Sequence, residues 1–102
     1  MQPKRALIMH SHDNVATAVE EIRAGEKVAV PLAGNFLTLI AAETIPFGFK
    51  LALEEIRQGE IIRKYGETIG RASTVIAKGA MVHIHNLEGT RARGDLERGG
   101  GR

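Results

Sequence analysis

The chain contains no cysteine, no tryptophan and few other aromatic residues, and each absence excludes a class of function. Without cysteine there are no disulfides, no thiolate metal ligands and no thiol nucleophiles. Aromatic residues make up only 4% of the 102 residues, so stacking platforms for sugars or single-stranded bases are scarce. Serine nucleophile elbows, phosphate loops and dinucleotide fingerprints are also missing. The chemistry left to this chain is that of a histidine metal site or acid–base site.

The net charge of +2 belongs to the C-terminal end of the chain. Residues 91–102 hold four arginines against one Asp and one Glu, whereas positive and negative side chains balance over residues 1–90. A neutral body argues against a nucleic-acid surface, which needs a clustered basic face. The longest apolar run near the N-terminus, Ala6–Met9, is too short for a signal or membrane segment. We therefore expect a cytoplasmic protein that binds neither nucleic acid nor membranes.

The first quarter of the sequence predicts a strand followed by a short helix. Residues 5–10 are typical of a strand, and Asp13 is a good N-cap. We predict a helix over about 14–23, ended by Gly25, because four apolar residues recur there at helical spacing: Val15, Ala18, Val19 and Ile22.

After residue 25 the pattern changes to short apolar runs interrupted by glycine, which is typical of a compact, mainly β domain. In the last predicted strand, His83 and His85 share the outer face, while Val82 and Ile84 fill the core. A helical turn is expected at 54–58, and strands are expected at 28–31, 37–40, 50–53, 61–64, 67–69, 74–76 and 81–85.

A short skeleton, Ile-x-x-Gly followed by Val or Ile three residues later, occurs three times, beginning at Ile22, Ile56 and Ile76. An apolar anchor, a glycine with positive φ and a new strand together describe a recurring turn inside one globule. Residues 1–90 are predicted to form this single domain. Residues 91–102, rich in Gly and Arg with one leucine, are predicted to form a flexible tail.

All four histidines occur in two His-x-His pairs, at positions 10 and 12 and at positions 83 and 85. On a strand, residues i and i+2 point to the same face, so each pair could hold a first-row metal. The competing interpretation is that each imidazole binds a backbone group or caps a turn. Lys64, Tyr65 and Gly66 likewise suit either a site or an ordinary exposed turn.

Four segments carry a resemblance to a known family: HSHDNVATAV (10–19), IPFGFKLAL (45–53), GEIIRKYGETIGRA (59–72) and IAKGAMVHIHNLEGTRARGDL (76–96). Together they resemble the SAF domain of the altronate/galactarate dehydratase family. The same domain stands alone as the small subunit of similar lyases, including sulfolactate sulfo-lyase. The resemblance covers about residues 10–96, and its most specific elements in combination are KYG-x-x-IG-x-A and VHIHN.

The resemblance implies a β-clip fold, built of short bent strands folded over themselves. It also implies a lyase that removes water or another leaving group from a hydroxy acid or sugar acid. In such a family the catalytic metal, iron or manganese, belongs mainly to a large second domain or subunit. We therefore expect a large lyase subunit as partner and a hydroxy acid as substrate, with self-association left open.

The resemblance places most of the candidate site residues on family-motif positions, and the chemistry of an elimination suggests their roles. Catalytic roles fall on His85, Lys64, His10 and Tyr65. A metal-ligand role falls on His83 and His85. Asn14, Lys50 and Asn86 are expected to bind substrate, and Arg91 and Arg93 supply forked donors suited to carboxylates.

One departure matters for function. Family members usually carry a histidine where this chain has Phe49. Two hypotheses therefore stand: a subunit of a dehydratase-type lyase that is inactive alone, or a non-catalytic β-clip module for ligand binding or assembly.

Overall fold

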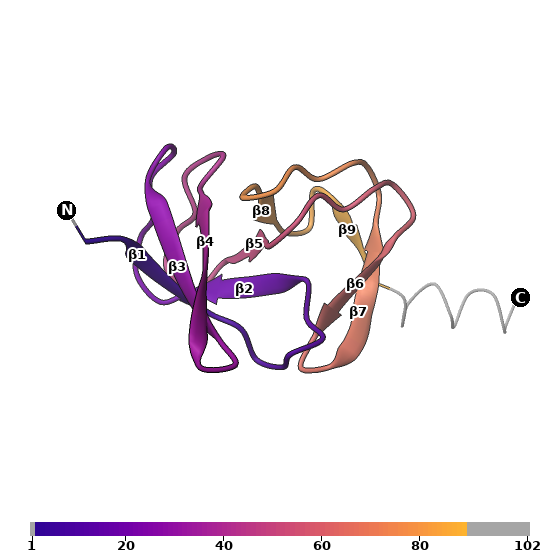
Figure 1. Ribbon diagram of the computed structural model, residues 1–102. Coiled ribbons are helices and arrows are strands. Elements are labelled where there is room, and N and C mark those ends of the chain that lie inside the picture. Colours follow the sequence, from indigo (N-terminus) through magenta and orange to yellow (C-terminus); the bar gives the residue numbers. More distant parts are fainter. Residues whose placement is uncertain (1, 90–102) are drawn as a thin grey trace, which may run out of the picture.

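The computed structural model describes residues 2–89, which form two β-sheets and contain no helix (Figure 1). The mainly β prediction is confirmed. The predicted tail, with Arg91 and Arg93, lies outside the described residues. No helix within residues 2–89 has the length and apolar character needed to cross a membrane.

The larger sheet has six strands in the order β4-β3-β1-β2-β5-β8, and the smaller has three in the order β6-β7-β9. Among the described strands, only β1 and β3 pair in parallel. The strands are β1 Lys4–Leu7, β2 Val15–Ala18, β3 Lys27–Leu32, β4 Asn35–Ile40, β5 Lys50–Ala52, β6 Ile61–Lys64, β7 Glu67–Ala72, β8 Met81–Val82 and β9 Leu87–Glu88.

The predicted helix at 14–23 is wrong, because residues 15–18 form β2 in the middle of the larger sheet. Val15 packs in one hydrophobic cluster and Ala16 in the other, so this strand is buried on both faces. A strand buried on both faces shows no alternation, and its apolar residues can match helical spacing by chance.

Three further expectations are corrected. Residues 54–58 form a bend and a bridge rather than a helical turn, and residues 74–76 contribute only a bridge at Ile76. The last predicted strand ends at Val82, and residues 83–86 turn away. Ile84 is consequently 82% exposed instead of filling the core. The strands predicted from 28 to 69 are confirmed as β3 to β7, with shifted ends.

The recurring turn is present four times rather than three. The full motif is Ala-x-x-x-Ile-x-x-Gly, at 18–25, 41–48, 52–59 and 72–79, so the sequence skeleton missed the copy at 41–48. In every copy the glycine has φ between +85° and +88°, as the positive-φ prediction requires. The next residue donates its N–H to the carbonyl three positions earlier, at 2.9–3.0 Å. This is a β-turn with glycine at the left-handed position.

The four copies pair two by two, with small buried alanines allowing the turns to approach closely. In each pair the glycine N–H of one copy donates to the alanine C=O of the other at 2.8 Å: Gly25 to Ala41, Gly48 to Ala18, Gly59 to Ala72 and Gly79 to Ala52. The central isoleucines face each other in buried bridges: Ile22 with Ile45, and Ile56 with Ile76.

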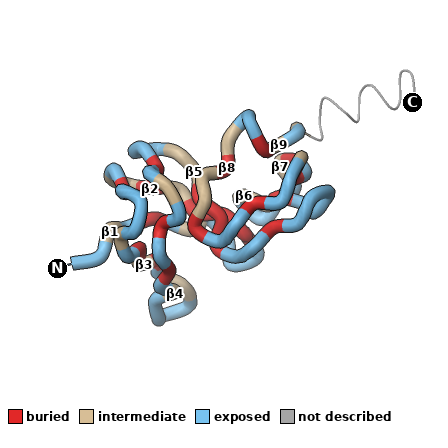
Figure 2. Tube along the Cα trace, turned by 90° about the horizontal axis from the view of Figure 1, so that it is seen from above, coloured by how far each residue is buried: buried red, intermediate tan, exposed pale blue. Residues whose placement is uncertain are grey.

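Each pair of copies belongs to one hydrophobic cluster, and β2 and β5 run between the two clusters. Figure 2 shows buried residues recurring at intervals through both halves of the molecule. Val15 and Ala52 face the cluster beneath the smaller sheet, whereas Ala16 and Leu51 face the other. The loop before β2 and the β6–β7 hairpin meet at the junction of the two halves, where half of the predicted site residues lie.

Candidate functional site

A two-residue turn, Tyr65–Gly66, connects β6 to β7 and forms the centre of the candidate site. Lys64 pairs with Glu67, and both turn residues have positive φ, +61° for Tyr65 and +73° for Gly66. A turn of this type requires positive φ at both central residues. Asn and Gly tolerate positive φ better than other residues, so Asn-Gly is the usual pair. Tyr65 nevertheless occupies the first of these positions and is 61% exposed.

Asp13, in the loop between β1 and β2, accepts hydrogen bonds from both residues of this turn. Its Oδ2 accepts the N–H of Tyr65 at 2.9 Å and its Oδ1 accepts the N–H of Gly66 at 2.8 Å. The residue is only 7% exposed. The predicted N-cap role is wrong, since no helix follows, but the carboxylate does bind backbone N–H groups.

Asn14 fastens the same loop to β6. Its Nδ2 donates to the carbonyl of Ile61 at 2.9 Å, and its Oδ1 accepts the N–H of Arg63 at 2.8 Å. Arg63 returns the contact by donating from Nε to the carbonyl of His12 at 2.6 Å. Both ends of the Asn14 amide are thus engaged by the backbone, while its predicted substrate contact stays a prediction.

His10 completes the contact between the loop and the turn. Its Nδ1 accepts the N–H of His12 at 3.1 Å, so the neutral imidazole carries its proton on Nε2. The ring lies against Gly66: a Cβ at that position would come within 2.9 Å of Cδ2 and Cγ. The rings of His10 and His12 are 5.0 Å apart between centroids and tilted by 55°.

Two lysines bring positive charge to this region. The Nζ of Lys64 lies 5.0 Å from the ring centroid of Tyr65, in a cation–π arrangement. Burial lowers the pKa of Lys50 below its ordinary value of 10.5, and the charge of nearby Lys64 lowers it further. Within residues 2–89, no carboxylate forms an ion pair with either lysine. The arrangement therefore suits an acidic ligand.

The residues at 83–86 form a separate turn beside β5. The ring centroids of Phe49 and His83 lie 4.7 Å apart. Phe49 also packs against the hydrophobic cluster that contains Ala16. Asn86 is 5% exposed; its Oδ1 accepts the N–H of His83 at 2.9 Å and its Nδ2 donates to the carbonyl of Met81 at 2.8 Å. Asn86 thus shapes the turn, and His85 stands exposed on it.

The fit to a metal follows from this geometry. Residues 83–86 turn instead of continuing β8, so His83 and His85 do not lie on one face of a strand as predicted. Among residues 2–89 no three His, Asp or Glu side chains come together as a ligand set. The described residues therefore do not fit a self-contained metal centre.

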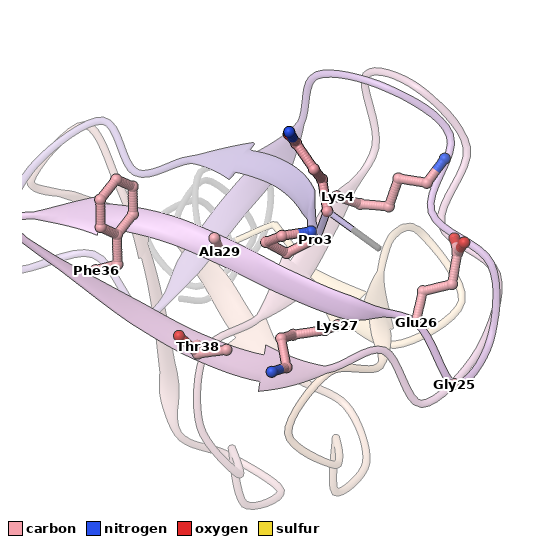
Figure 3. Close-up of a pocket in the computed structure, with 9 residues that line it drawn as sticks. Pro3, Lys4, Gly25, Glu26, Lys27, Ala29, Phe36 and Thr38 are labelled. Carbon is pink, nitrogen blue, oxygen red and sulfur yellow. The ribbon is translucent and has the colours of Figure 1, made fainter.

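A hollow of the described surface lies away from this cluster (Figure 3). It measures about 620 Å³ and is lined by residues 2–4 and by β3 and β4 with the turn before β3. Phe36 lies toward one end of it and Glu26 toward the other (Figure 3). None of the predicted site residues lines it.

The structure thus brings His10, Tyr65, Lys64 and Lys50 to one region, together with the loop residue Asn14. His83, His85 and Asn86 belong to the neighbouring turn. Sequence reasoning missed the holding role of Asp13, because it arises from a partner more than fifty residues away. The available indication was the Tyr-Gly pair between two short apolar runs, which is typical of a hairpin turn.

Comparison with known proteins identifies the family. The altronate/galactarate dehydratase SAF domain family matches residues 4–90. This chain belongs to that family. The SAF domain is 35% identical over 85 residues to altronate dehydratase of Bacillus subtilis, and 37% identical over 78 residues to that of Escherichia coli. These matches cover 83% and 76% of this chain, but only 16% and 15% of the dehydratases.

A second group of relatives has similar length. The SAF domain is 31% identical over 85 residues to (2R)-sulfolactate sulfo-lyase subunit alpha of Chromohalobacter salexigens, covering 79% of this chain and 90% of that subunit. The resemblance inferred from the KYG and VHIHN elements is therefore confirmed.

Proposed function

We propose that this SAF domain is the small subunit of a two-component lyase that eliminates water, or another leaving group, from a sugar acid or related hydroxy acid. The observation that carries the proposal is the match over 90% of a relative that is itself named a subunit of a lyase. The remaining catalytic machinery is then supplied by a large subunit. The paired repeats and bent short strands support a β-clip fold as part of the same proposal.

The cluster around the Tyr65–Gly66 turn suits the chemistry of such an elimination. Removing a proton beside a carboxylate requires a base, and the developing negative charge requires a cation. The ammonium groups of Lys50 and Lys64, which form no ion pair within residues 2–89, supply positive charge for the substrate carboxylate.

The leaving hydroxyl can accept a hydrogen bond from His10, whose neutral ring carries its proton on Nε2. Tyr65 offers a second donor, its phenolic hydroxyl, and its side chain is exposed to solvent or to a partner. His85 serves as the base in this proposal: its neutral imidazole accepts the α-proton and returns it to the leaving hydroxyl, which departs as water. His85 is exposed on the neighbouring turn, and we assign it to the face that meets the large subunit.

The proposal places the divalent metal, iron or manganese, mainly in the large subunit. Among residues 2–89 no three potential metal ligands come together, so most of a metal coordination sphere is left to other ligands. A bound metal would polarise the oxygen of the substrate.

Reconstitution tests the proposal directly. The chain is purified alone and together with a chain that resembles the remaining part of altronate dehydratase and is encoded in the same genome. Altronate, galactarate and (2R)-sulfolactate are offered with iron(II) or manganese(II), and formation of the 2-oxo acid is followed. We expect turnover only in the mixture, reduced at least tenfold by Lys64→Met and unchanged by Lys78→Met, which alters an exposed lysine.

Two results would contradict the proposal. Turnover by the isolated chain would show that no second subunit is needed. A stable complex that turns over none of these acids would favour the alternative, a non-catalytic module. The packing of Phe49 against His83 supports that alternative, since an apolar ring stands where the family resemblance leads us to expect an imidazole.

A further inference from the structure

Tyr65 adopts a backbone conformation that its own side chain disfavours. Its φ of +61° lies in the left-handed region, where residues other than Gly, Asn and Asp are uncommon. Ala33, in the β3–β4 hairpin, shares this conformation with φ of +53°. Of these two hairpin turns, however, only Tyr65–Gly66 is described as donating its backbone N–H groups to a side-chain carboxylate. Tyr65 is also largely exposed, so its ring gains little from packing in the core.

The stabilising contact comes from Asp13. Each of its two carboxylate oxygens accepts one N–H of the turn, at 2.9 Å from Tyr65 and 2.8 Å from Gly66. Hydrogen bonds to an ionised acceptor are stronger than neutral ones, and two of them fix both residues of the turn at once. Asp13 is itself fixed, because its N–H donates to the carbonyl of His10 at 2.9 Å.

This contact determines where the reactive groups stand. The turn carries Lys64 and Tyr65, and the loop that ends in Asp13 carries His10. When Asp13 is bonded to the turn, the His10 ring lies against Gly66. The loop before β2 and the β6–β7 turn then keep one relative position. Without the Asp13 contact, the only described side-chain bonds between the loop and β6 are those of Asn14 and Arg63, which reach no further than residue 63.

We propose that Asp13 is the positioning residue of this site: its carboxylate holds the Tyr65–Gly66 turn in the left-handed conformation and thereby sets Lys64 and Tyr65 beside His10. The proposal deepens the lyase function and rests on it for its catalytic consequence. Asp13 acts through the turn rather than on the substrate, since both of its oxygens are bonded to backbone N–H groups. Misplacing reacting groups by about 1 Å can slow catalysis a hundredfold.

The test compares Asp13→Ala and Asp13→Asn with Glu43→Ala in the full chain. Glu43 is a matched control, since its carboxylate accepts the N–H of Met81 at 2.9 Å in the other half of the molecule. Nuclear magnetic resonance of the isolated chain reports amide exchange at residues 65 and 66 and the proximity of His10 to Gly66. The reconstituted complex reports kcat and KM.

We expect Asp13→Ala to lose at least tenfold protection at both amides and to lose the His10–Gly66 proximity, while the Ile56–Ile76 bridge stays protected. Asp13→Asn, with one carbonyl oxygen, is expected to lie between Asp13→Ala and the native chain. We expect kcat to fall at least tenfold in Asp13→Ala with little change in KM. Glu43→Ala is expected to change none of these quantities.

A rescue variant separates positioning from a general structural role. Asparagine tolerates the left-handed region, so Tyr65→Asn added to Asp13→Ala is expected to restore the His10–Gly66 proximity. Retention of the proximity and of both protected amides in Asp13→Ala would overturn the proposal, as would loss of activity with the turn intact. If Asp13→Ala does not fold, Asp13→Asn with a fully protected turn would overturn it. If no large subunit confers activity, the lyase function fails while the resonance data still decide the role of Asp13.

Discussion

The imidazole of His10 lies against the α-carbon of Gly66, so close that a Cβ at position 66 would come within 2.9 Å of two ring carbons. Glycine is therefore required there for two reasons, its φ of +73° and the contact with the ring. Gly34 lies in the two-residue turn between β3 and β4. It has φ of +80°, but a Cβ at this position would face open space. A comparison of the two glycines therefore distinguishes the free-energy cost of a left-handed backbone from that of the steric contact with His10.

We expect Gly66→Ala to lower the free energy of unfolding by about 2–3 kcal/mol, against about 1 kcal/mol for Gly34→Ala, because only the first adds a steric overlap. Urea unfolding of both variants measures the difference. Adding His10→Ala to Gly66→Ala is expected to remove most of the excess. Equal losses for the two glycines would show that the His10 contact adds no constraint.

Asn86 is predicted to matter for stability. Asn86→Ala removes two hydrogen bonds and leaves the N–H of His83 without its partner, so we expect a loss of about 2–3 kcal/mol. Asn35→Ala, at an exposed residue that accepts only the N–H of Phe36, is expected to cost less than about 1 kcal/mol. Thermal unfolding compares the two. A loss for Asn86→Ala no larger than the control would contradict the structural role of this amide.

The lowered pKa of Lys50 predicts a pH dependence of stability. Between that lowered pKa and 10.5, the unfolded chain holds more protons at this residue than the folded chain, so the free energy of unfolding rises with pH. Below the folded pKa both states are protonated and the contribution of Lys50 is constant and unfavourable. We expect Lys50→Met to reduce the rise seen in urea unfolding between pH 7 and 10.5. Lys78→Met should retain that rise, and identical profiles for the two variants would count against a partly buried charge at Lys50.

The imidazole pairs predict weak metal binding by the chain alone. Calorimetric titration with iron(II), manganese(II) and zinc(II) is expected to show dissociation constants weaker than about 1 μM, because two imidazoles leave a coordination shell incomplete. His85→Ala is expected to change these titrations little. A stoichiometric site tighter than this, lost in His83→Ala or His85→Ala, would instead demonstrate a metal centre in this chain.

The candidate site was predictable in its residue types and only partly in its geometry. The KYG and VHIHN elements identified the family, and His10, Lys50, Lys64 and Tyr65 do gather in one region. The shared outer face of His83 and His85 was not found, because Asn86 bonds back to His83 and Met81 and turns the chain after residue 82. A side-chain bond of this kind leaves no periodicity in the sequence.

The sequence by itself determined the strand-rich character, the glycine turns and the family, since these depend on local conformational preference and on residue identity. Only the tertiary structure decided that residues 15–18 form a strand, because that choice depends on β1 and β5 on either side and on two hydrophobic clusters, one against each face. It also decided the role of Asp13, whose carboxylate reaches the turn at 65–66. Contacts across fifty residues arise when the chain folds, and local sequence patterns do not encode them.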